Sequence, residues 1–434
     1  MNPSLRLFDR QSKRYTLSEK LGEGGEGTIH TVAEDDALVA KVYHPRRRDT
    51  LRHTKLRRLL DKGLTRELAL KTRIAFPLEI LYDERKRFVG YLMPRVAGIP
   101  LKTAFFSRKR LGERFPNLRR RDLAAYARHF VLQLDFLHRH GILVGDINPL
   151  NLLVDPDAPT RGWIIDADSF QVDDLPCPVG TEIFTPPSLQ GCSFGERLRS
   201  PEDEHFSMAI MIFMILMLGK HPYSRIGGES PAANIRRHAF PYPDLHGKMT
   251  DVPPGIWQFI WSHFDRGLKE GFHDVFARDL RYDTAEWLQR LQKYHYNVSK
   301  GYFSDEIAPL SYRALHPVRV RCHQCERDFE LSEKFVARLK SEGKKPLCSL
   351  CREKIRAATL ARQSLRHSDK RLRRQRIRAA VGARAARETA AAQVTQASAN
   401  PYDPQTIVSK AIRSASNAGA AHPSLSALLK KLIP

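Results

Sequence analysis

One stretch near the middle of the chain, residues 143–170, places three polar residues beside two apolar runs. Asp146 precedes Asn151 by five positions, and Asp166 follows that asparagine by fifteen. The apolar runs predict two short buried strands joined by a turn, at residues 152–154 and 163–165. Because magnesium prefers hard oxygen ligands shared between carboxylates and substrate phosphates, this hairpin indicates a magnesium–phosphate site. The alternative is a carboxylate-rich surface hairpin that binds nothing.

A glycine-rich segment lies near the start of the chain, directly after a predicted strand at residues 15–20. Its glycines follow a Gly-x-Gly-x-x-Gly pattern that ends before a β-branched residue. The residues concerned are Gly22, Gly24, Gly25, Gly27 and Ile29. Glycines let backbone N–H groups approach phosphates that larger side chains would push away. Strand-like residues on both sides favour a hairpin over phosphates rather than the strand–helix turn of a dinucleotide-binding fold.

The next predicted strand, at residues 38–43, contains a single cation, Lys41, in an apolar run. A buried lysine needs a partner, because an unpaired desolvated charge is costly. An edge-strand lysine that reaches solvent is the plain alternative.

The glycine segment, the lysine and the Asp-x-x-x-x-Asn…Asp pattern occur in an order that resembles the protein kinases. The wording Gly-Asp-Ile-Asn-Pro and Ile-Asp-Ala-Asp-Ser-Phe is similar to a bacterial group of divergent serine/threonine-kinase-like proteins. The resemblance covers roughly residues 15–292. It implies an α+β, two-lobed protein kinase-like fold over residues 14–296. The small β-rich lobe would span about residues 14–98, and the helical lobe about residues 99–296.

The resemblance also implies a role for each matching residue. Asp146 would accept the proton of a substrate hydroxyl, while Asn151 and Asp166 would hold Mg²⁺ or Mn²⁺. Lys41 and the glycine segment, residues 22–27 with Ile29, would bind the phosphates of ATP. The segment that resembles the kinase hinge supplies the adenine contacts, with a gatekeeper side chain, a carbonyl and a further backbone group. These come from Met93, Pro94 and Val96 respectively.

Several positions depart from the kinase pattern. Val144-Gly145 stands where kinases usually have His-Arg, which predicts no buried cation to neutralise an activation-loop phosphate. Asn148 replaces a usual lysine and could bond a γ-phosphate only as a neutral amide. Losing a charge aimed at the transition state can cost about 2–4 kcal/mol, so turnover is expected to be slow. Asp168, two residues after the metal-loop Asp166, is expected to cap the following turn, with metal ligation as the alternative.

The resemblance leaves three acid partners open. Either Asp61 or Glu67 would orient Lys41. Ser188 replaces a glutamate that normally pairs with a buried arginine, expected here at Arg281, so another acid would have to substitute. The anchoring acid of the apolar helix that follows residue 203 would be one of two neighbours, Asp203 or Glu204.

Four of the six cysteines form two Cys-x-x-Cys pairs: Cys322, Cys325, Cys348 and Cys351. This spacing predicts a closed tetrahedral Zn²⁺ site with a structural role, in a unit too short to fold unaided. We expect a zinc-ribbon-like module at residues 318–354, after a linker at residues 297–317. His323 lies inside the first pair and is an alternative ligand.

The net charge of +24 is unevenly distributed, since 26 Lys and Arg against 9 Asp and Glu follow Leu310. Residues 355–434 are expected to form a basic, Ala/Arg-rich helix followed by a low-complexity tail. A possible partner for this region is nucleic acid or an acidic protein, and a solvated charged helix is the alternative. The N-terminus lacks the apolar core of a signal peptide, and the longest apolar run, eleven residues, is too short to span a bilayer. A cytoplasmic location is therefore expected.

We therefore predict an ATP- and magnesium-dependent kinase that phosphorylates Ser or Thr hydroxyls of a protein substrate, in bacterial regulation or stress signalling. One alternative is a pseudokinase scaffold that binds nucleotide without transferring phosphate. The other is a nucleic-acid-binding protein whose kinase fold is regulatory.

Overall fold

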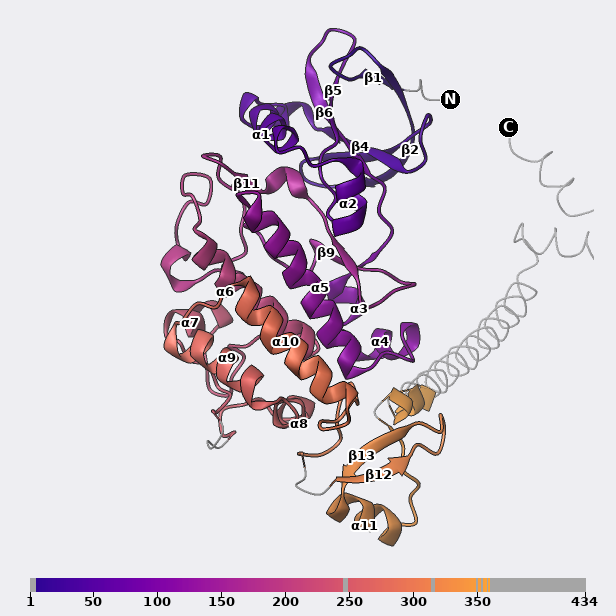
Figure 1. The fold of residues 1–434 in the computed structure, drawn as a ribbon. Helices are drawn as coiled ribbons and strands as arrows, with labels where there is room; N and C mark the ends of the chain where they lie inside the picture. The colour runs from indigo at the N-terminus through magenta and orange to yellow at the C-terminus, as the bar shows by residue number, and fades with distance from the viewer. Residues whose placement is uncertain are drawn as a thin grey trace, which may run out of the picture. The chain divides into compact units, whose positions relative to one another are not determined.

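The computed structural model describes residues 5–244, 249–313, 317–348, 350–352, 354–356 and 358–359. The basic helix and tail expected at residues 355–434 therefore lie almost wholly outside the described residues. The described chain begins with a strand-rich lobe and continues into a helical one (Figure 1). This arrangement confirms the expected α+β class and the two-lobed, protein kinase-like fold.

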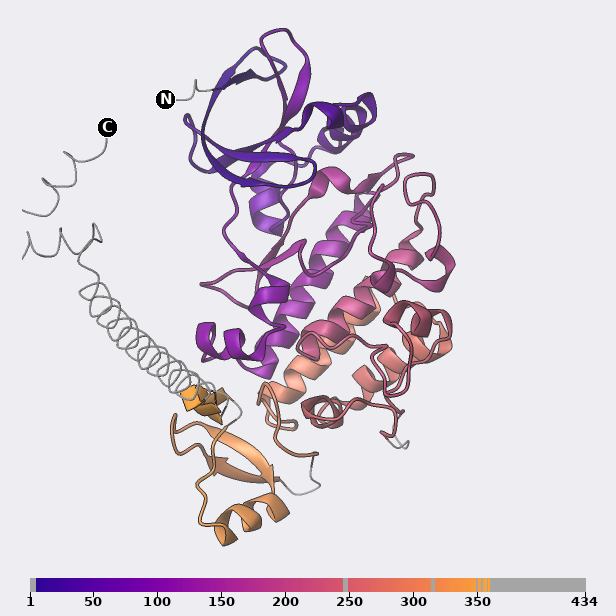
Figure 2. The ribbon, with the colours of Figure 1, turned by 180° about the vertical axis from the view of Figure 1, so that it is seen from behind.

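The small lobe is a closed barrel of six strands in the order β1-β2-β3-β4-β6-β5. The strands are β1 (Arg6–Phe8), β2 (Arg14–Glu23), β3 (Gly27–Val32), β4 (Leu38–Tyr43), β5 (Glu79–Tyr82) and β6 (Phe88–Pro94). The first of these was not expected from the sequence, and it closes the barrel by pairing Phe8 with Tyr82. From behind, the strands are seen curling around a common interior (Figure 2). Alternating residues fill that interior, among them Leu7, Tyr15, Leu17, Ala40 and Leu92.

Two helices follow β4 on the outside of the barrel. Helix α1 (Thr50–Asp61) begins at Asp49, whose side chain accepts a hydrogen bond from the N–H of Arg52. It contacts β5 and also residues 167–169, the segment that carries Asp168. The short 3-10 helix η1 (Pro45–Arg47) precedes α1, and helix α2 (Arg66–Thr72) follows it.

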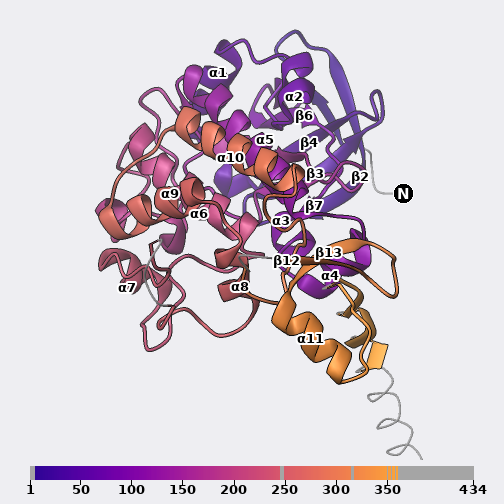
Figure 3. The same cartoon turned by 60° about the horizontal axis from the view of Figure 1, so that its bottom comes forward.

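The large lobe is organised around three long helices. Helix α5 (Arg120–Arg139) packs along α10 (Thr284–Ser299) and against α6 (Pro201–Leu216), as Figure 3 shows. From Phe206 onward helix α6 is buried on all sides, as its nearly continuous apolar sequence allows, and its methionines lie in the core. The shorter helices are α3 (Leu101–Ala104), α4 (Arg108–Arg114), α7 (Pro231–Arg236), α8 (Ile256–Ser262) and α9 (Arg266–Arg278).

Two small sheets lie where the lobes meet. The first has the order β10-β9-β7, with β7 (Ile99–Pro100), β9 (Leu152–Val154) and β10 (Gly162–Ile164), and it contains the expected hairpin. The second pairs β8 (Ile142–Leu143) with β11 (Gln171–Val172). Between β10 and β11 the chain forms the 3-10 helix η2 (Ala167–Ser169). Two further 3-10 helices, η3 (Glu182–Phe184) and η4 (Pro187–Leu189), follow in the segment before α6.

The stretch expected to be a linker, residues 297–317, is in part built into the large lobe. Its first three residues belong to α10, and Ile307 and Ala308 join the main core. The fully buried guanidinium of Arg120 on α5 donates hydrogen bonds to the carbonyls of Glu306 and Ile307. The sequence did not reveal this packing, because the segment carries no helical or strand periodicity of its own.

The four-cysteine unit contains a two-stranded sheet and a helix. Strands β12 (Pro317–Arg321) and β13 (Asp328–Ser332) pair antiparallel, and α11 (Glu333–Ser341) follows. Its small core is formed by Phe329, Leu331 and three of the four cysteines. Among the described residues, no helix combines the length and the apolar character that a bilayer crossing requires.

Candidate active site

The loop between β8 and β9 contains three of the expected site residues, Asp146, Asn148 and Asn151. The Asp146 carboxylate accepts a hydrogen bond from Nδ2 of Asn148 at 2.8 Å. Nδ2 of Asn151 donates to the main-chain carbonyl of Asp146 at 3.1 Å. The loop therefore holds Asp146 and Asn151 side by side, as the five-residue spacing predicts.

Both ends of the Asn148 amide are used within this loop. Its Oδ1 accepts from the N–H of Leu150 at 2.9 Å while its Nδ2 donates to Asp146, and the side chain is buried. The amide therefore orients Asp146 and is not directed outward. The sequence left open that the Asn148 amide bonds a γ-phosphate; in this structure the amide bonds the neighbouring carboxylate.

Asp166 is brought to the same place by the β9–β10 hairpin. The N–H of Ile165 donates to the carbonyl of Asn151 at 3.0 Å, which ties the end of β10 to the start of β9. Asp166 itself has a left-handed backbone, with φ of 66° and ψ of 36°. A non-glycine residue in this conformation is uncommon and is often found at functional sites. The carboxylate is 40% exposed, so it remains open to a ligand.

Lys41 on β4 joins this group from the small lobe. Its ammonium lies 2.8 Å from a carboxylate oxygen of Asp166 and 2.8 Å from both oxygens of Asp168. Glu26, in the glycine segment, is 3.7 Å away. These are the acids within 4 Å of the ammonium in the described part of the chain. The expectation that Asp61 or Glu67 orients Lys41 is therefore wrong.

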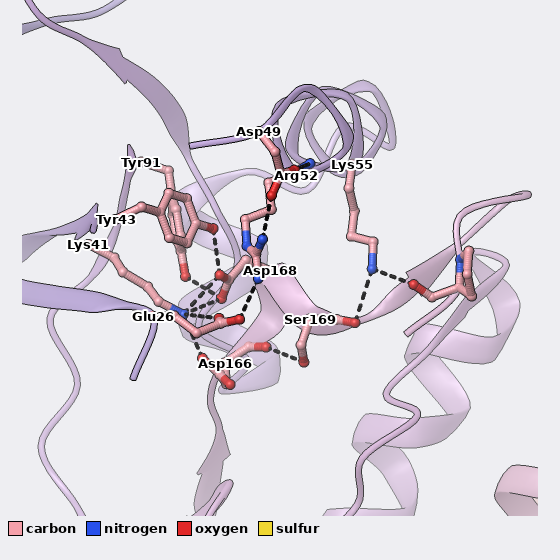
Figure 4. A network of polar contacts seen from close by, with 11 residues as sticks. Glu26, Lys41, Tyr43, Asp49, Arg52, Lys55, Tyr91, Asp166, Asp168 and Ser169 are labelled. Carbon is pink, nitrogen blue, oxygen red and sulfur yellow. Dashed lines mark hydrogen bonds and ion pairs between the residues drawn. The ribbon is translucent and has the colours of Figure 1, made fainter. Parts of the chain in front are cut away.

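Asp168 does not cap the following turn, contrary to our expectation. Its carboxylate is buried and accepts hydrogen bonds from the hydroxyls of Tyr43 at 2.5 Å and Tyr91 at 2.7 Å, in addition to Lys41. Figure 4 shows the lysine and both tyrosines pointing at this carboxylate. In this structure both of its oxygens are occupied by these donors. Asp168 is a fixed anion inside the junction of the lobes.

The charges in this group shift one another's pKa values. Burial alone would lower the pKa of Lys41, but the charges of Asp168 and Asp166 raise it above the ordinary value. Burial opposes ionisation of Asp168, but Lys41 and the two tyrosine hydroxyls hold its pKa below the usual range. Burial and the neighbouring charge of Asp168 raise the pKa of Asp166. The lysine is therefore charged at neutral pH and shared between two unequal acids.

The glycine segment forms the turn between β2 and β3, as expected. The N–H of Gly24 donates to the carbonyl of Gly27 at 2.9 Å. A β carbon at Gly22, Gly24 or Gly25 would meet no atom within 4 Å, so the turn presents an open backbone surface. At Gly27 a β carbon would lie 2.3 Å from the carbonyl of Val42, so this glycine is required by the β3–β4 pairing. Ile29 lies within β3, directly opposite Lys41.

Glu26, between these glycines, was not singled out from the sequence. Its carboxylate accepts from Arg52 of α1 at 2.6 Å and faces Lys41. Arg52 in turn pairs with Asp49, the N-cap of α1. The tip of the glycine segment is thus linked to the start of α1. A carboxylate inside a predicted phosphate-binding turn is the signal that could have found this contact.

The segment expected to be the hinge follows β6. Met93 and Pro94 are the last residues of that strand and pair with Val39 and Leu38 of β4. The N–H of Arg95 donates to the carbonyl of Ala37 at 2.8 Å, and Val96 lies in the connection to β7. The three residues expected to read adenine, Met93, Pro94 and Val96, remain a proposal.

A buried cation does lie beside Val144-Gly145, against our expectation. Arg199 donates to the carbonyls of Cys177 at 2.9 Å and Val179 at 2.7 Å. Gly145 has φ of +76°, and a β carbon there would lie 2.5 Å from Cβ of Cys177 and 3.0 Å from the guanidinium. A guanidinium from later in the chain therefore lies beside this loop, and it donates to main-chain carbonyls.

Helix α6 anchors the same loop through Glu204 and not through Asp203. The buried Glu204 carboxylate accepts from the N–H groups of Val144 at 3.1 Å and Gly145 at 2.6 Å. It also lies 2.9 Å from Nε2 of His138. Asp203 instead forms the capping box of α6 with Ser200.

The segment before α6 contacts the carboxylate of Asp146. The hydroxyl of Thr181 donates to the second oxygen of Asp146 at 3.0 Å.

Ser188, which replaces the glutamate that was expected to pair with Arg281, lies 3.3 Å from Asp203. Arg281 pairs instead with Asp279 at 2.8 Å and packs over the ring of Phe206. The acid that satisfies Arg281 is therefore a local one.

The residues expected to hold magnesium fit such an ion chemically. Asn151 donates through Nδ2 to Asp146, which leaves its oxygen Oδ1 as the ligating end of the amide. Asp166 adds a half-exposed carboxylate whose other partner is an ammonium. One amide oxygen and one carboxylate leave room for the water and phosphate oxygens that magnesium usually retains.

The four cysteines converge as their spacing predicts, with all ligand atoms within 4.8 Å of one another. Sγ of Cys325 lies 3.7 Å from Sγ of Cys348, close to the separation of about 3.8 Å that zinc–sulfur bonds of about 2.3 Å give in a tetrahedron. Although burial opposes it, backbone N–H donors lower the pKa of Cys322 to about 6. This cluster, which does not include His323, is compatible with structural zinc.

Comparison with known proteins agrees with this geometry. No protein-family model matches the chain. It is 31% identical over 275 residues to the protein kinase YegI of Escherichia coli strain K12, covering 62% of this chain and 40% of that protein. The chain is similar to a divergent bacterial protein kinase. The corresponding protein of Escherichia coli O157:H7 is 31% identical over 269 residues, or 61% of this chain and 39% of that one.

The chain thus spans less than half the length of these curated relatives. Among solved structures, titin kinase and its flanking domains superpose with a TM-score of 0.48 at 15% identity. That superposition covers 69% of this chain and 49% of the other.

Proposed function

We propose that this protein is an ATP- and magnesium-dependent kinase that phosphorylates Ser or Thr hydroxyls of a protein substrate. The observation that carries the proposal is one connected set of contacts. Asn151 bonds Asp146 through its side chain and Ile165 through its main chain, and the next residue, Asp166, pairs with Lys41. Segments more than one hundred residues apart thus meet around a base, two oxygen ligands and a cation.

In this proposal the oxygen of the substrate hydroxyl attacks the γ-phosphorus of ATP, and Asp146 accepts the proton of that hydroxyl. The bond from phosphorus to the bridging oxygen breaks, and ADP leaves. Lys41 and the open backbone of residues 22–27 neutralise and hold the phosphates. Asn148 keeps one carboxylate oxygen of Asp146 oriented by a hydrogen bond of 2.8 Å.

Magnesium, held by Asn151 and Asp166, would supply positive charge that offsets the charge developing on the phosphate oxygens. The usual lysine near Asp146 is absent, and the amide that replaces it is occupied within the loop. We therefore expect a low turnover number. The adenine would be bound by the carbonyl of Pro94 and the backbone of Val96, with Met93 beside it.

A phosphotransfer assay with labelled ATP and Mg²⁺ tests the proposal. Wild-type protein should label itself or a protein substrate, and Asp146→Ala and Asp166→Ala should each lower labelling at least about 100-fold. Asp157→Ala is the matched control, because Asp157 is an exposed aspartate on the same hairpin. Labelling that is unchanged in Asp146→Ala would reject the proposed role of this carboxylate.

A nucleotide-binding scaffold without transfer is the second candidate, and the environment of Asn148 favours it. The amide is neutral and bonded on both ends within the loop, so no cation from this position reaches a γ-phosphate. In that case ATP would raise the melting temperature of the protein, but phosphotransfer would not occur with any metal ion. The same preparation answers both questions.

A further inference from the structure

We propose that Asp168 is the positioning residue for Lys41, in the role that we expected an acid near helix α1 to fill. The inference rests on the proposed function, because it assigns Lys41 to the nucleotide phosphates. It names the residue that holds Lys41. By holding this lysine, Asp168 also limits its competition with magnesium for Asp166, the proposed metal ligand.

The geometry is that of a fully occupied anion site. Both oxygens of Asp168 lie 2.8 Å from the ammonium of Lys41. The hydroxyls of Tyr43 and Tyr91 donate to the same carboxylate, one to each oxygen. Lys41 and Tyr43 share a face of β4 because they are two residues apart, and Tyr91 is paired opposite Lys41 on β6. Three donors from two adjacent strands therefore converge on one acid (Figure 4).

Helix α1 presents a cation where an acid would be needed. Lys55 is buried and donates to the carbonyls of Ser169 at 3.3 Å and Pro176 at 2.6 Å. Figure 4 shows its side chain directed to the far side of the segment that carries Asp168. An ammonium at this place cannot pair with Lys41. Lys55 instead fastens α1 to the residues that follow Asp168.

The two aspartates of this segment thus divide the work. Asp168 is 3% exposed, and its oxygens are occupied by the lysine and the two tyrosine hydroxyls. The side chain of Asp166 is 40% exposed, and among the described residues its carboxylate accepts a hydrogen bond from Lys41 alone. If Asp168 lost its charge, the acids left within 4 Å of Lys41 would be Asp166 and Glu26. The lysine would then compete with magnesium for Asp166.

This competition gives the inference a measurable signature. We expect Asp168→Asn to raise the Mg²⁺ concentration that half-saturates binding of the fluorescent analogue trinitrophenyl-ATP by at least 5-fold. In the phosphotransfer assay the same variant should lower kcat at least 10-fold and raise the KM for ATP less. A purely structural aspartate would not shift the Mg²⁺ requirement of a folded protein.

Matched variants test the same network more gently. Tyr43→Phe and Tyr91→Phe remove one donor each and should raise the Mg²⁺ requirement by about 2-fold, in the same direction as Asp168→Asn. Tyr82→Phe is the control for a lost tyrosine hydroxyl, since that hydroxyl bonds His53 away from the site. Asp61→Asn is the control for a lost aspartate charge on α1. Both controls should bind the analogue as wild type does.

The outcomes separate this inference from the proposed function. Wild-type binding that depends on Mg²⁺, with Asp168→Asn folded and identical to wild type, overturns the role of Asp168 and leaves the kinase proposal standing. Wild-type protein that binds the analogue but never transfers phosphate overturns the kinase proposal, while the Mg²⁺ shift still decides the role of Asp168. If Asp168→Asn does not fold, the tyrosine variants decide, and values equal to that of Tyr82→Phe overturn the inference.

Discussion

Glu204, in the first turn of α6, accepts a hydrogen bond of 2.6 Å from the main-chain N–H of Gly145, the residue before Asp146. The proposed base is therefore held in place by the most deeply buried helix of the large lobe. A second bond to Val144 and the contact with His138 complete the environment of this carboxylate. The position of the loop thus depends on a buried acid from another element of the fold.

Replacing that acid should weaken both stability and activity. In Glu204→Gln one amide N–H must face the donors of the loop, which leaves at least one buried donor unsatisfied. We expect the free energy of unfolding to fall by about 1–3 kcal/mol, measured by urea denaturation. Glu202→Gln, at an exposed glutamate in the same first turn, removes only a favourable charge at the helix N-terminus and should lower the free energy by less than about 1 kcal/mol. Equal stability of the two variants would contradict the anchoring role.

Gly145 should not tolerate a side chain. Gly145→Ala combines a φ of +76° with a β carbon 2.5 Å from Cβ of Cys177. Gly63 has a similar φ of +70° but open space around it, so Gly63→Ala measures the conformational cost alone. We expect about 1 kcal/mol for Gly63→Ala and about 1–3 kcal/mol more for Gly145→Ala, from thermal or urea unfolding. Similar losses in both variants would mean that the contact with Cys177 relaxes freely.

Stability should fall in mild acid partly because of His221. This buried ring lies 2.8 Å from the carbonyl of Ile183 through Nε2, and its Nδ1 accepts from the N–H of Tyr223. The ring is therefore neutral, and burial lowers its pKa from 6.5 to about 4. Between these two values the unfolded chain binds more protons than the folded chain, so stability is full above pH 6.5 and decreases toward pH 4.

The contribution of His221 over that range is about 2–3 kcal/mol, at about 1.4 kcal/mol for each pKa unit. Urea denaturation at pH 7, 6, 5 and 4 measures it. In His221→Gln, which keeps a donor and an acceptor but does not titrate, the slope between pH 6.5 and 4 should be smaller. An unchanged slope would assign the acid sensitivity to other groups.

Removing metal should affect the cysteine unit. Purified protein should contain about one zinc ion per chain, because four thiolates complete one tetrahedral site. Cys348→Ser should lose the ion, while Cys192→Ser, outside the cluster, should keep it. Zinc released by a thiol reagent and measured with a colorimetric chelator gives the stoichiometry. Zinc-free wild-type protein with folded β12 and β13 would reject a structural role for the metal.

The sequence was most informative where function depends on spacing along the chain. The separation of Asp146, Asn151 and Asp166 across two apolar runs anticipated a hairpin that joins them, and the paired cysteines anticipated their cluster. These features depend on local geometry, since a short loop or a tight hairpin leaves few ways to arrange its residues.

Features that depend on packing could not be predicted in the same way. Asp203 and Glu204 are neighbours in one helical turn, and only the faces of α6 decide which of them reaches the loop. Asp168 was expected to cap a turn because the sequence does not show which strand residues lie opposite it. The two-residue spacing of Lys41 and Tyr43 was a usable clue, since both side chains share one face of a strand.

The short strand β1 has a consequence for recognition. By pairing Phe8 with Tyr82 it joins the first and last strands of the barrel order through one residue pair. An incoming peptide, or a second copy of the chain, that added a strand at this seam by main-chain hydrogen bonds would have to displace β1. A macromolecule that docks at the seam while β1 stays in place is therefore selected by side chains and loop shape.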